Sequence, residues 1–173
     1  MKSNLITIFI LGGFTVGATQ MSGAIAQSPT KVRFYCGQTF DPNSNAIVPT
    51  TLVASSAKRE PIALIQWKSK LSGKYTPQVR CNMVSDKFQQ AWSAKRLKYL
   101  TAGVDKKSGL GIICGAKERA TACNRSSMLF TLSNGADATE TIDRMKDIKA
   151  GTGSNPVPQS SGDGIIDISS IIN

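Results

Sequence analysis

Residues 76–92 have the sequence TPQVRCNMVSDKFQQAW and predict the main helix of the protein. Thr76 can cap this helix, and Pro77 suits its first position because a proline has no N–H group to leave unpaired there. Apolar side chains then recur at helical spacing on one face: Cys81, Val84, Phe88, Ala91 and Trp92. We therefore expect an amphipathic helix over about residues 77–96 that packs one face against a core.

Short stretches rich in β-branched and aromatic residues lie on both sides of this helix and predict strands. They are residues 31–36, 50–54, 62–67, 97–104, 110–115 and 127–132. Residues 37–49, between the first two, are rich in turn-forming residues and are expected to form a loop. The expected fold class is α+β: a mostly antiparallel sheet of about five or six strands packed against the main helix.

The last part of the chain predicts a second helix, a linker and a terminal strand. Asp137 with Glu140 makes a start that resembles a capping box, for a helix over about residues 138–149. Residues 150–164 are mainly Gly, Ser, Pro and Asn, the composition of a flexible linker. Residues 165–173 are rich in isoleucine, which favours docking on the domain as an edge strand over exposure to water. The alternative is that this segment binds a partner.

Residues 1–26 have the pattern of a secretory signal peptide. Lys2 supplies the basic start, an apolar run follows, and Ala24-Ile25-Ala26 is a small-x-small cleavage site. The apolar run spans about a dozen residues, whereas a membrane span needs roughly 20, so an uncleaved anchor is the weaker alternative. We expect an exported protein of the periplasm or cell envelope, with one domain over residues 27–149 and no transmembrane segment in its mature part.

Four cysteines follow the predicted cleavage site: Cys36, Cys81, Cys114 and Cys123. An even number of cysteines in an exported domain predicts two disulfides. A metal site built from four thiolates would normally show two closely spaced cysteine pairs, and the spacing here is wide and uneven. Three connectivities are possible. We favour Cys36–Cys81 with Cys114–Cys123, because the second pair flanks a short turn and can meet locally.

The chain is basic, with 21 Lys and Arg against 11 Asp and Glu. Such a surface attracts anionic lipid head groups or polysaccharide, and nucleic acid is disfavoured as a partner of an exported protein. The candidate contacts lie near aromatic residues: Lys68, Lys70, Lys74, Lys95, Arg96 and Lys98. Expected partners are an anionic membrane surface or an envelope protein. In the alternative interpretation these lysines are merely solvated.

Catalytic and cofactor motifs are weak in this sequence. The absence of histidine excludes Ser-His-Asp and Cys-His nucleophiles and histidine metal ligands. Asp41, Asn43 and Asn45 match the first positions of a calcium loop, but Ala46 replaces its glycine and Leu52 its closing glutamate. We expect a non-catalytic module without a cofactor or a metal site. The alternative is a histidine-free enzyme or an enzyme inhibitor in the periplasm.

A set of short motifs is spread over residues 32–148. They are Phe34-x-Cys36, Pro49-Thr50-Thr51, Trp67, Arg80-Cys81-x-x-Val84-Ser85-x-x-Phe88-Gln89, Leu97-Lys98-Tyr99-Leu100-Thr101-x-Gly103 and Leu129-Phe130-Thr131-Leu132. This set resembles the cyanobacterial circadian oscillating protein family. The resemblance implies a protein whose abundance follows a daily rhythm and which associates peripherally with a membrane. It implies no reaction and no catalytic residues.

Overall fold

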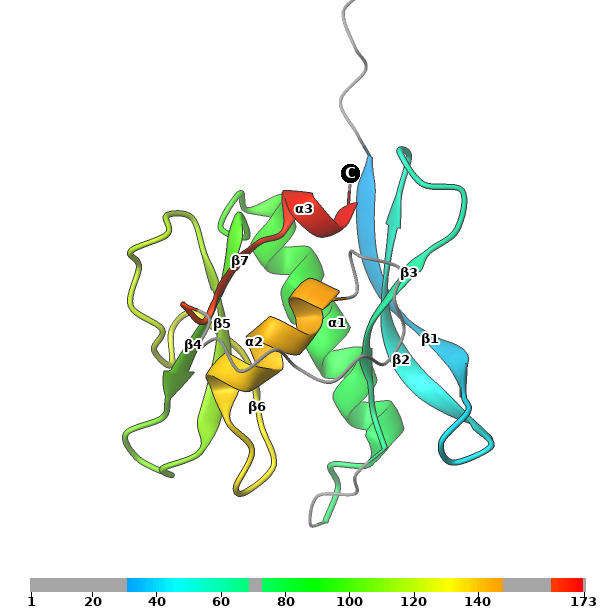
Figure 1. Ribbon diagram of the computed structural model, residues 1–173, viewed down its shortest axis with the longest axis horizontal. Coiled ribbons are helices and arrows are strands. Elements are labelled where there is room, and N and C mark those ends of the chain that lie inside the picture. The colour runs from blue at the N-terminus through cyan, green and yellow to red at the C-terminus, as the bar shows by residue number, and fades with distance from the viewer. Residues whose placement is uncertain (1–30, 69–72, 148–162, 173) are drawn as a thin grey trace, which may run out of the picture.

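The computed structural model describes residues 31–68, 73–147 and 163–172, and within them seven strands form two antiparallel sheets (Figure 1). The first sheet has the order β1 (Val32–Asp41), β2 (Ala46–Ser55), β3 (Ile62–Gln66). The second has the order β6 (Met128–Thr131), β5 (Gly111–Ala116), β4 (Tyr99–Val104), β7 (Ile165–Asp167). The predicted signal peptide at 1–26, and residues 150–162 of the predicted linker, lie outside the described residues.

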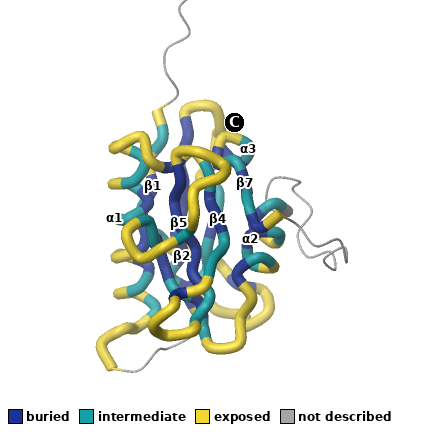
Figure 2. The backbone as a smooth tube through the Cα atoms, turned by 90° about the vertical axis from the view of Figure 1, so that its left-hand side faces the viewer, coloured by how far each residue is buried: buried dark blue, intermediate teal, exposed yellow. Residues whose placement is uncertain are grey.

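Two helices close the space between the sheets, and a third short helix, α3 (Ser169–Ile172), lies at one end (Figure 1). The helices α1 (Pro77–Ser93) and α2 (Ala138–Asp147) lie on opposite sides of that space, as the second view shows (Figure 2). Figure 2 also shows that buried residues concentrate on the strands, whereas the connecting turns are exposed. The turns at the two ends of the sheets are therefore where charged side chains reach solvent.

The main helix begins where the sequence predicts. The Thr76 hydroxyl accepts a hydrogen bond from the Val79 amide at 3.3 Å, and Pro77 occupies the first turn. The helix ends at Ser93 and not near residue 96, because the chain turns away through residues 94–96. For α2, the Asp137 carboxylate caps the Glu140 amide at 2.7 Å. Residues 148–149 of the predicted second helix lie outside the described residues.

Aromatic rings connect the two sheets through α1. Phe34 of β1 lies 5.4 Å from Phe88, ring centre to ring centre, and Phe88 lies 6.4 Å from Phe130 of β6. Trp67, just after β3, meets Phe130 edge to face at 5.7 Å. All four side chains are buried, so the core of the domain is this row of rings with the aliphatic residues around it.

A buried polar contact adds to this core. The Thr51 hydroxyl of β2 accepts hydrogen bonds from the Trp67 indole N–H and from the Ser85 hydroxyl, each at 3.0 Å. Thr51 and Ser85 are almost fully buried, so each needs a partner inside the protein. The three side chains therefore fix the position of α1 on the first sheet.

The favoured disulfide connectivity is confirmed. Cys36–Cys81 joins β1 to α1 with Cα atoms 5.5 Å apart, and Cys114–Cys123 joins β5 to the loop that follows it, at 5.4 Å. Gly103 of β4 is packed against the second disulfide. A Cβ atom at that position would lie 2.7 Å from the Cβ of Cys123, so only glycine fits.

The predicted α+β class is confirmed, and the structure differs from the prediction in two details. The strands belong to two sheets and not to one. Residues 37–49, predicted as a loop, are largely strand: β1 continues to Asp41, and β2 begins at Ala46. Pairing between the two strands outweighs the turn composition here, and the hydroxyls of Thr39 and Thr50, which are diagonal neighbours on the two strands, lie 2.7 Å apart.

The isoleucine-rich segment lies on the second sheet. Strand β7 pairs antiparallel with β4 and forms an edge of that sheet. Four isoleucines from β7, α3 and the residue between them are buried: Ile166, Ile168, Ile171 and Ile172. The segment therefore contributes to the core of the domain.

Candidate functional site

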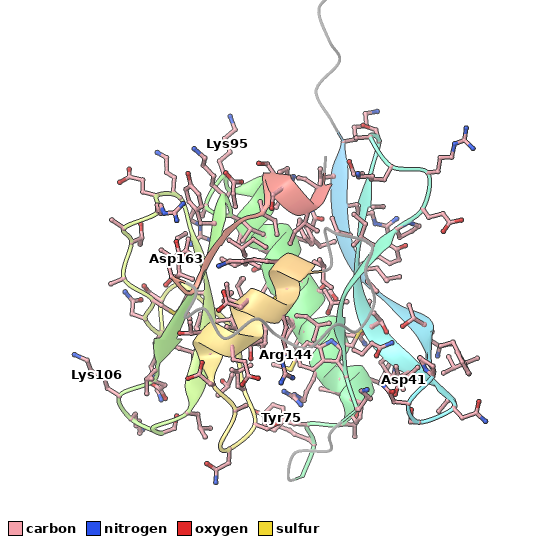
Figure 3. All side chains as sticks on the ribbon, in the orientation of Figure 1. Asp41, Tyr75, Lys95, Lys106, Arg144 and Asp163 are labelled. Carbon is pink, nitrogen blue, oxygen red and sulfur yellow. A yellow bond between two sulfur atoms is a disulfide. The ribbon has the colours of Figure 1, made fainter. Side chains whose placement is uncertain are left out.

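One end of the domain carries five exposed cations, which we call the basic end: Lys31, Lys95, Arg96, Lys98 and Lys117. Each lies where a strand or helix begins or ends, and Figure 3 labels Lys95 at this end. The turns are held together by backbone bonds, since the Lys98 amide donates to Ala116 and the Ile168 amide donates to Lys98, both at 2.9 Å. Lys58 and Arg59 lie in the turn beside Lys31, whose carbonyl accepts from Ser56 at 3.0 Å.

The cations of the basic end have no carboxylate partner among the described residues. Within the described part of the chain, none of the five takes part in an ion pair. Two acidic residues lie nearby, Glu118 and Asp167, but the Asp167 carboxylate accepts from the amide and the hydroxyl of Ser169 at 2.9 and 2.7 Å. The described residues therefore leave these five cations without an ion pair.

A cavity of about 950 Å³ opens at the basic end. Its apolar walls come from Val32 of β1, Trp92 of α1, Leu97 and Ile168. Trp92 is half-buried, and its ring centre lies 6.0 Å from that of Phe34. Lysines stand on the rim, so the cavity combines an apolar interior with a cationic opening.

The helix end at this cavity has an unusual residue. The Arg96 amide donates to the Ala91 carbonyl and the Lys95 amide to Trp92, at 2.8 and 2.9 Å, which is the bonding pattern of a Schellman cap. The residue after the cap takes a left-handed conformation, which favours glycine, and here it is Lys95 with φ of 55°. The chain therefore keeps a lysine at a position where its backbone is strained.

The opposite end of the domain also carries cations, and two of them, Lys68 and Arg125, are paired with buried carboxylates. Asp41, which is 1% exposed, accepts from the Ser44 hydroxyl at 2.5 Å and from the Lys68 ammonium at 3.0 Å. These hydrogen bonds, first from Ser44 and then from Lys68, hold the pKa of Asp41 below its usual value. Lys68 thus neutralises a carboxylate that closes the β1–β2 turn.

A second pair closes the β4–β5 turn at the same end. Arg125 donates to both oxygens of Asp105 at 2.7 Å, and the Ser108 hydroxyl donates to one of them at 2.7 Å. The contacts with Arg125 and then Ser108 place the pKa of Asp105 well below its usual range. This bidentate pair is a structural contact that holds a turn.

The sequence-predicted surface residues divide between the two ends. Lys95, Arg96 and Lys98 lie together at the basic end. Lys68 is paired with Asp41, and Lys74 lies over the Tyr75 ring; Figure 3 places Asp41 and Tyr75 far from Lys95. The structure therefore does not bring the six residues into one surface. Lys70 lies outside the described residues.

Sequence reasoning missed two members of the basic end, Lys31 and Lys117. Each is next to the end of a strand, and each joins Lys95 and Lys98 only through the pairing of distant strands. In the sequence, only their position indicated that these two lysines are exposed, because both lie at strand boundaries.

The most specific sequence motif, Arg80-Cys81-x-x-Val84-Ser85-x-x-Phe88-Gln89, has a structural role. The Arg80 guanidinium lies 4.6 Å from the Trp67 ring centre, and its Nη2 donates to Thr131. The side-chain carbonyl of Gln89 accepts from the Phe34 amide at 2.8 Å. Together with the Cys81 disulfide and the buried Ser85 and Phe88 described above, these contacts seat α1 between the sheets. The motif is explained by packing of the fold.

Metal sites and membrane spans are absent from what the structure describes. No three His, Cys, Asp or Glu side chains within residues 31–68, 73–147 and 163–172 lie close enough to hold a metal ion. Among the described helices, none combines the length and the apolar character that a membrane-spanning helix needs.

Comparisons with known proteins add one finding. No curated protein and no solved structure matches the chain. The family described as Circadian oscillating protein COP23 matches residues 33–173, which include both disulfides, all three helices and the isoleucine-rich segment. The chain belongs to the circadian oscillating protein COP23 family.

Proposed function

We propose that this protein is an exported, non-catalytic module that attaches peripherally to an anionic membrane surface through its basic end. The observation that supports it is the group of five exposed cations that have no carboxylate partner among the described residues: Lys31, Lys95, Arg96, Lys98 and Lys117. Each Lys or Arg near an anionic bilayer contributes about 1 kcal/mol of binding free energy. Five such residues are enough for reversible binding.

Export is the part of the proposal that the cysteines support. All four are paired in disulfides, and disulfides persist in oxidising compartments outside the cytosol. The family name supports a further part, that the abundance of the protein follows a daily rhythm. Immunoblots of cells sampled through a day and then in constant light test the rhythm, and a constant level would contradict it.

Native cells test the location. After periplasmic release, we expect the mature protein to stay with the membranes at low salt and to leave them in a high-salt wash. Salt has this effect because exposed charges more than about 10 Å apart are screened at 0.1 M salt. Release with the periplasm at low salt would favour a soluble partner and contradict membrane attachment.

Purified protein and vesicles test the basic end directly. We expect sedimentation with vesicles of phosphatidylglycerol and phosphatidylcholine, and none with phosphatidylcholine alone. Replacing Lys95, Lys98 and Lys117 by Ala should weaken binding roughly 100-fold, because three contributions of about 1 kcal/mol are lost.

A matched variant controls for net charge. Replacing Lys74, Lys106 and Lys107 by Ala removes the same charge from the opposite end, where Figure 3 labels Tyr75 and Lys106. This variant should bind within about three-fold of wild type, since its lysines face away from the bilayer and act only at long range. Equal losses in the two variants would mean that net charge alone drives binding, and the basic end would have no special role.

A further inference from the structure

The cavity at the basic end differs from a surface that only attracts charge. Its lining is mainly apolar, with the half-buried Val32 and Trp92 in its walls, and its volume of about 950 Å³ lies in the range of sites that take small organic ligands. Electrostatic attachment to a flat membrane surface needs exposed cations but no apolar cavity in the protein. The walls therefore indicate a ligand with an apolar part.

The rim adds the charge. Lys31, Lys95, Lys98 and Lys117 line the cavity together with Glu118 and Asp167, so four positive and two negative charges leave a net charge of +2 at the opening. One of the acids, Asp167, is already bonded to Ser169. An apolar interior under a cationic rim is complementary to a molecule with an apolar chain and an anionic head.

We propose that this cavity binds a single-chain anionic amphiphile of the fatty-acid class, with its chain against Val32 and Trp92 and its carboxylate at Lys95 and Lys98. The inference rests on the proposed function in using the same end of the domain, and it deepens that function by naming a ligand. This binding does not require a membrane, because a free fatty acid occupies the cavity by itself.

The backbone conformation of Lys95 is a second observation, independent of the cavity, that supports placing the ligand's carboxylate at this residue. A left-handed residue after a helix is usually glycine, since a side chain strains that conformation. Lys95 nevertheless holds an ammonium group at the rim. A role in binding an anion accounts for a lysine at this position.

The test uses the mature protein, residues 27–173, and dodecanoate below its critical micelle concentration, without vesicles. We expect saturable binding by calorimetry and a change in tryptophan fluorescence that the Trp92→Phe variant loses. Affinity should rise roughly four-fold per methylene group from hexanoate to dodecanoate, the factor that burial of about 0.8 kcal/mol per methylene gives. Dodecyltrimethylammonium, which has the same chain and a cationic head, should bind at least ten-fold more weakly.

Two variants locate the site. The double variant Lys95→Gly/Lys98→Ala should weaken dodecanoate binding about ten-fold or more, whereas Lys106→Ala/Lys107→Ala, which removes the same charge elsewhere, should leave it unchanged. All four lysines are exposed, so both variants should fold, and circular dichroism verifies this. Absence of dodecanoate binding to wild type, equal binding of the cationic amphiphile, or equal losses in the two variants would each overturn the inference.

The vesicle experiment separates this inference from the proposed function. Sedimentation with phosphatidylglycerol vesicles but no dodecanoate binding would support membrane attachment and overturn the cavity ligand. Dodecanoate binding without vesicle binding would support the cavity ligand and overturn membrane attachment.

Discussion

The two ends of the domain carry the same kinds of cation and use them differently. At the end that contains Asp41 and Asp105, two cations, Lys68 and Arg125, pair with these buried carboxylates, which close turns. At the basic end, cations surround a cavity and have no carboxylate partner among the described residues. Figure 3 labels Asp41 and Lys95 at these two ends. The comparison teaches that the position of the carboxylates, more than the number of cations, decides which cations of this domain form ion pairs.

Burial explains the two ion pairs of Asp41 and Asp105. Asp41 is 1% exposed and Asp105 is 7% exposed, and a buried carboxylate needs hydrogen bonds or a cation to offset the loss of water. Lys68 and Arg125 meet this need. The lysines of the basic end are exposed, so they have no such requirement and keep their water until a ligand displaces it.

The largest expected effect comes from releasing α1, the helix that runs between the two ends. Replacing Cys36 and Cys81 by Ala removes a crosslink over 45 residues, which should lower the free energy of unfolding by about 4 kcal/mol. The loss should affect both ends together, because α1 begins at one and finishes at the other (Figure 1). Urea denaturation of the oxidised proteins measures it.

The second disulfide is the control for that prediction. Replacing Cys114 and Cys123 by Ala removes a crosslink over only 9 residues, and the expected loss is about 3 kcal/mol. A larger loss from the short crosslink than from the long one would contradict this account of the two disulfides.

The two ends should also differ in how much a lysine-to-alanine substitution lowers thermal stability, and this effect is smaller. Lys68→Ala leaves the buried Asp41 carboxylate without its cation and should lower the thermal midpoint measurably. Lys98→Ala removes an exposed cation without an ion-pair partner and should change stability by less than about 0.5 kcal/mol. Thermal unfolding followed by circular dichroism compares them. If Lys98→Ala proved the more destabilising of the two, the division into structural and available cations would be wrong.

Acid should weaken the paired end in a predictable direction. Because the pKa of Asp105 is lower in the folded protein than in the unfolded chain, the unfolded chain binds more protons below about pH 5, and stability falls as the pH falls. The stabilisation is fully present above the unfolded value of about 3.9 and is lost as the pH drops toward the lower folded value. Asp105→Asn should be less stable at neutral pH and should lose less stability on acidification.

Urea denaturation of wild type and Asp105→Asn between about pH 7 and about pH 2 measures the two slopes. Lys98→Ala at the basic end is the control, since it removes no carboxylate and no ion pair in the described part of the chain. Its acid slope should match that of wild type. Parallel slopes for wild type and Asp105→Asn would show that Asp105 does not contribute to acid sensitivity.

The elements with a strong local pattern could be predicted from the sequence. The start of α1 was recognisable because Thr76 and Pro77 act within one turn of the helix, and its buried face because apolar residues repeat at helical spacing. The end of α1 was predicted too late. Glycine is the usual stop signal after a helix, and here Lys95 takes that conformation, so the sequence contained no stop signal.

Features that depend on distant pairing could not be predicted. Lys68 appeared to be an available cation because its partner, Asp41, is 27 residues earlier in the chain and reaches it only through the arrangement of the first sheet. Lys31 and Lys117 were missed for the corresponding reason. Each has its neighbours at the basic end only after the strands of two sheets are paired.

The last prediction concerns Lys95, where stability and binding should change in opposite directions. Lys95→Gly relieves the left-handed backbone strain and should raise the free energy of unfolding by about 1 kcal/mol, while it removes a cation from the rim and weakens dodecanoate binding. Lys95→Ala removes the same cation and the same favourable contact with the helix dipole, but it keeps the strain. The alanine variant should bind dodecanoate as weakly as the glycine variant, but it should not show the glycine variant's gain in stability.

Thermal unfolding and calorimetry of wild type, Lys95→Gly and Lys95→Ala measure both properties on the same samples. Equal stabilities for the Gly and Ala variants would mean that the backbone at this position is not strained. A glycine variant that is more stable and binds as well as wild type would show that the lysine is not there for the ligand. A more stable and weaker-binding glycine variant would mean that the basic end gives up fold stability to hold one cation at the cavity, whereas Lys68 and Arg125 at the opposite end stabilise the fold.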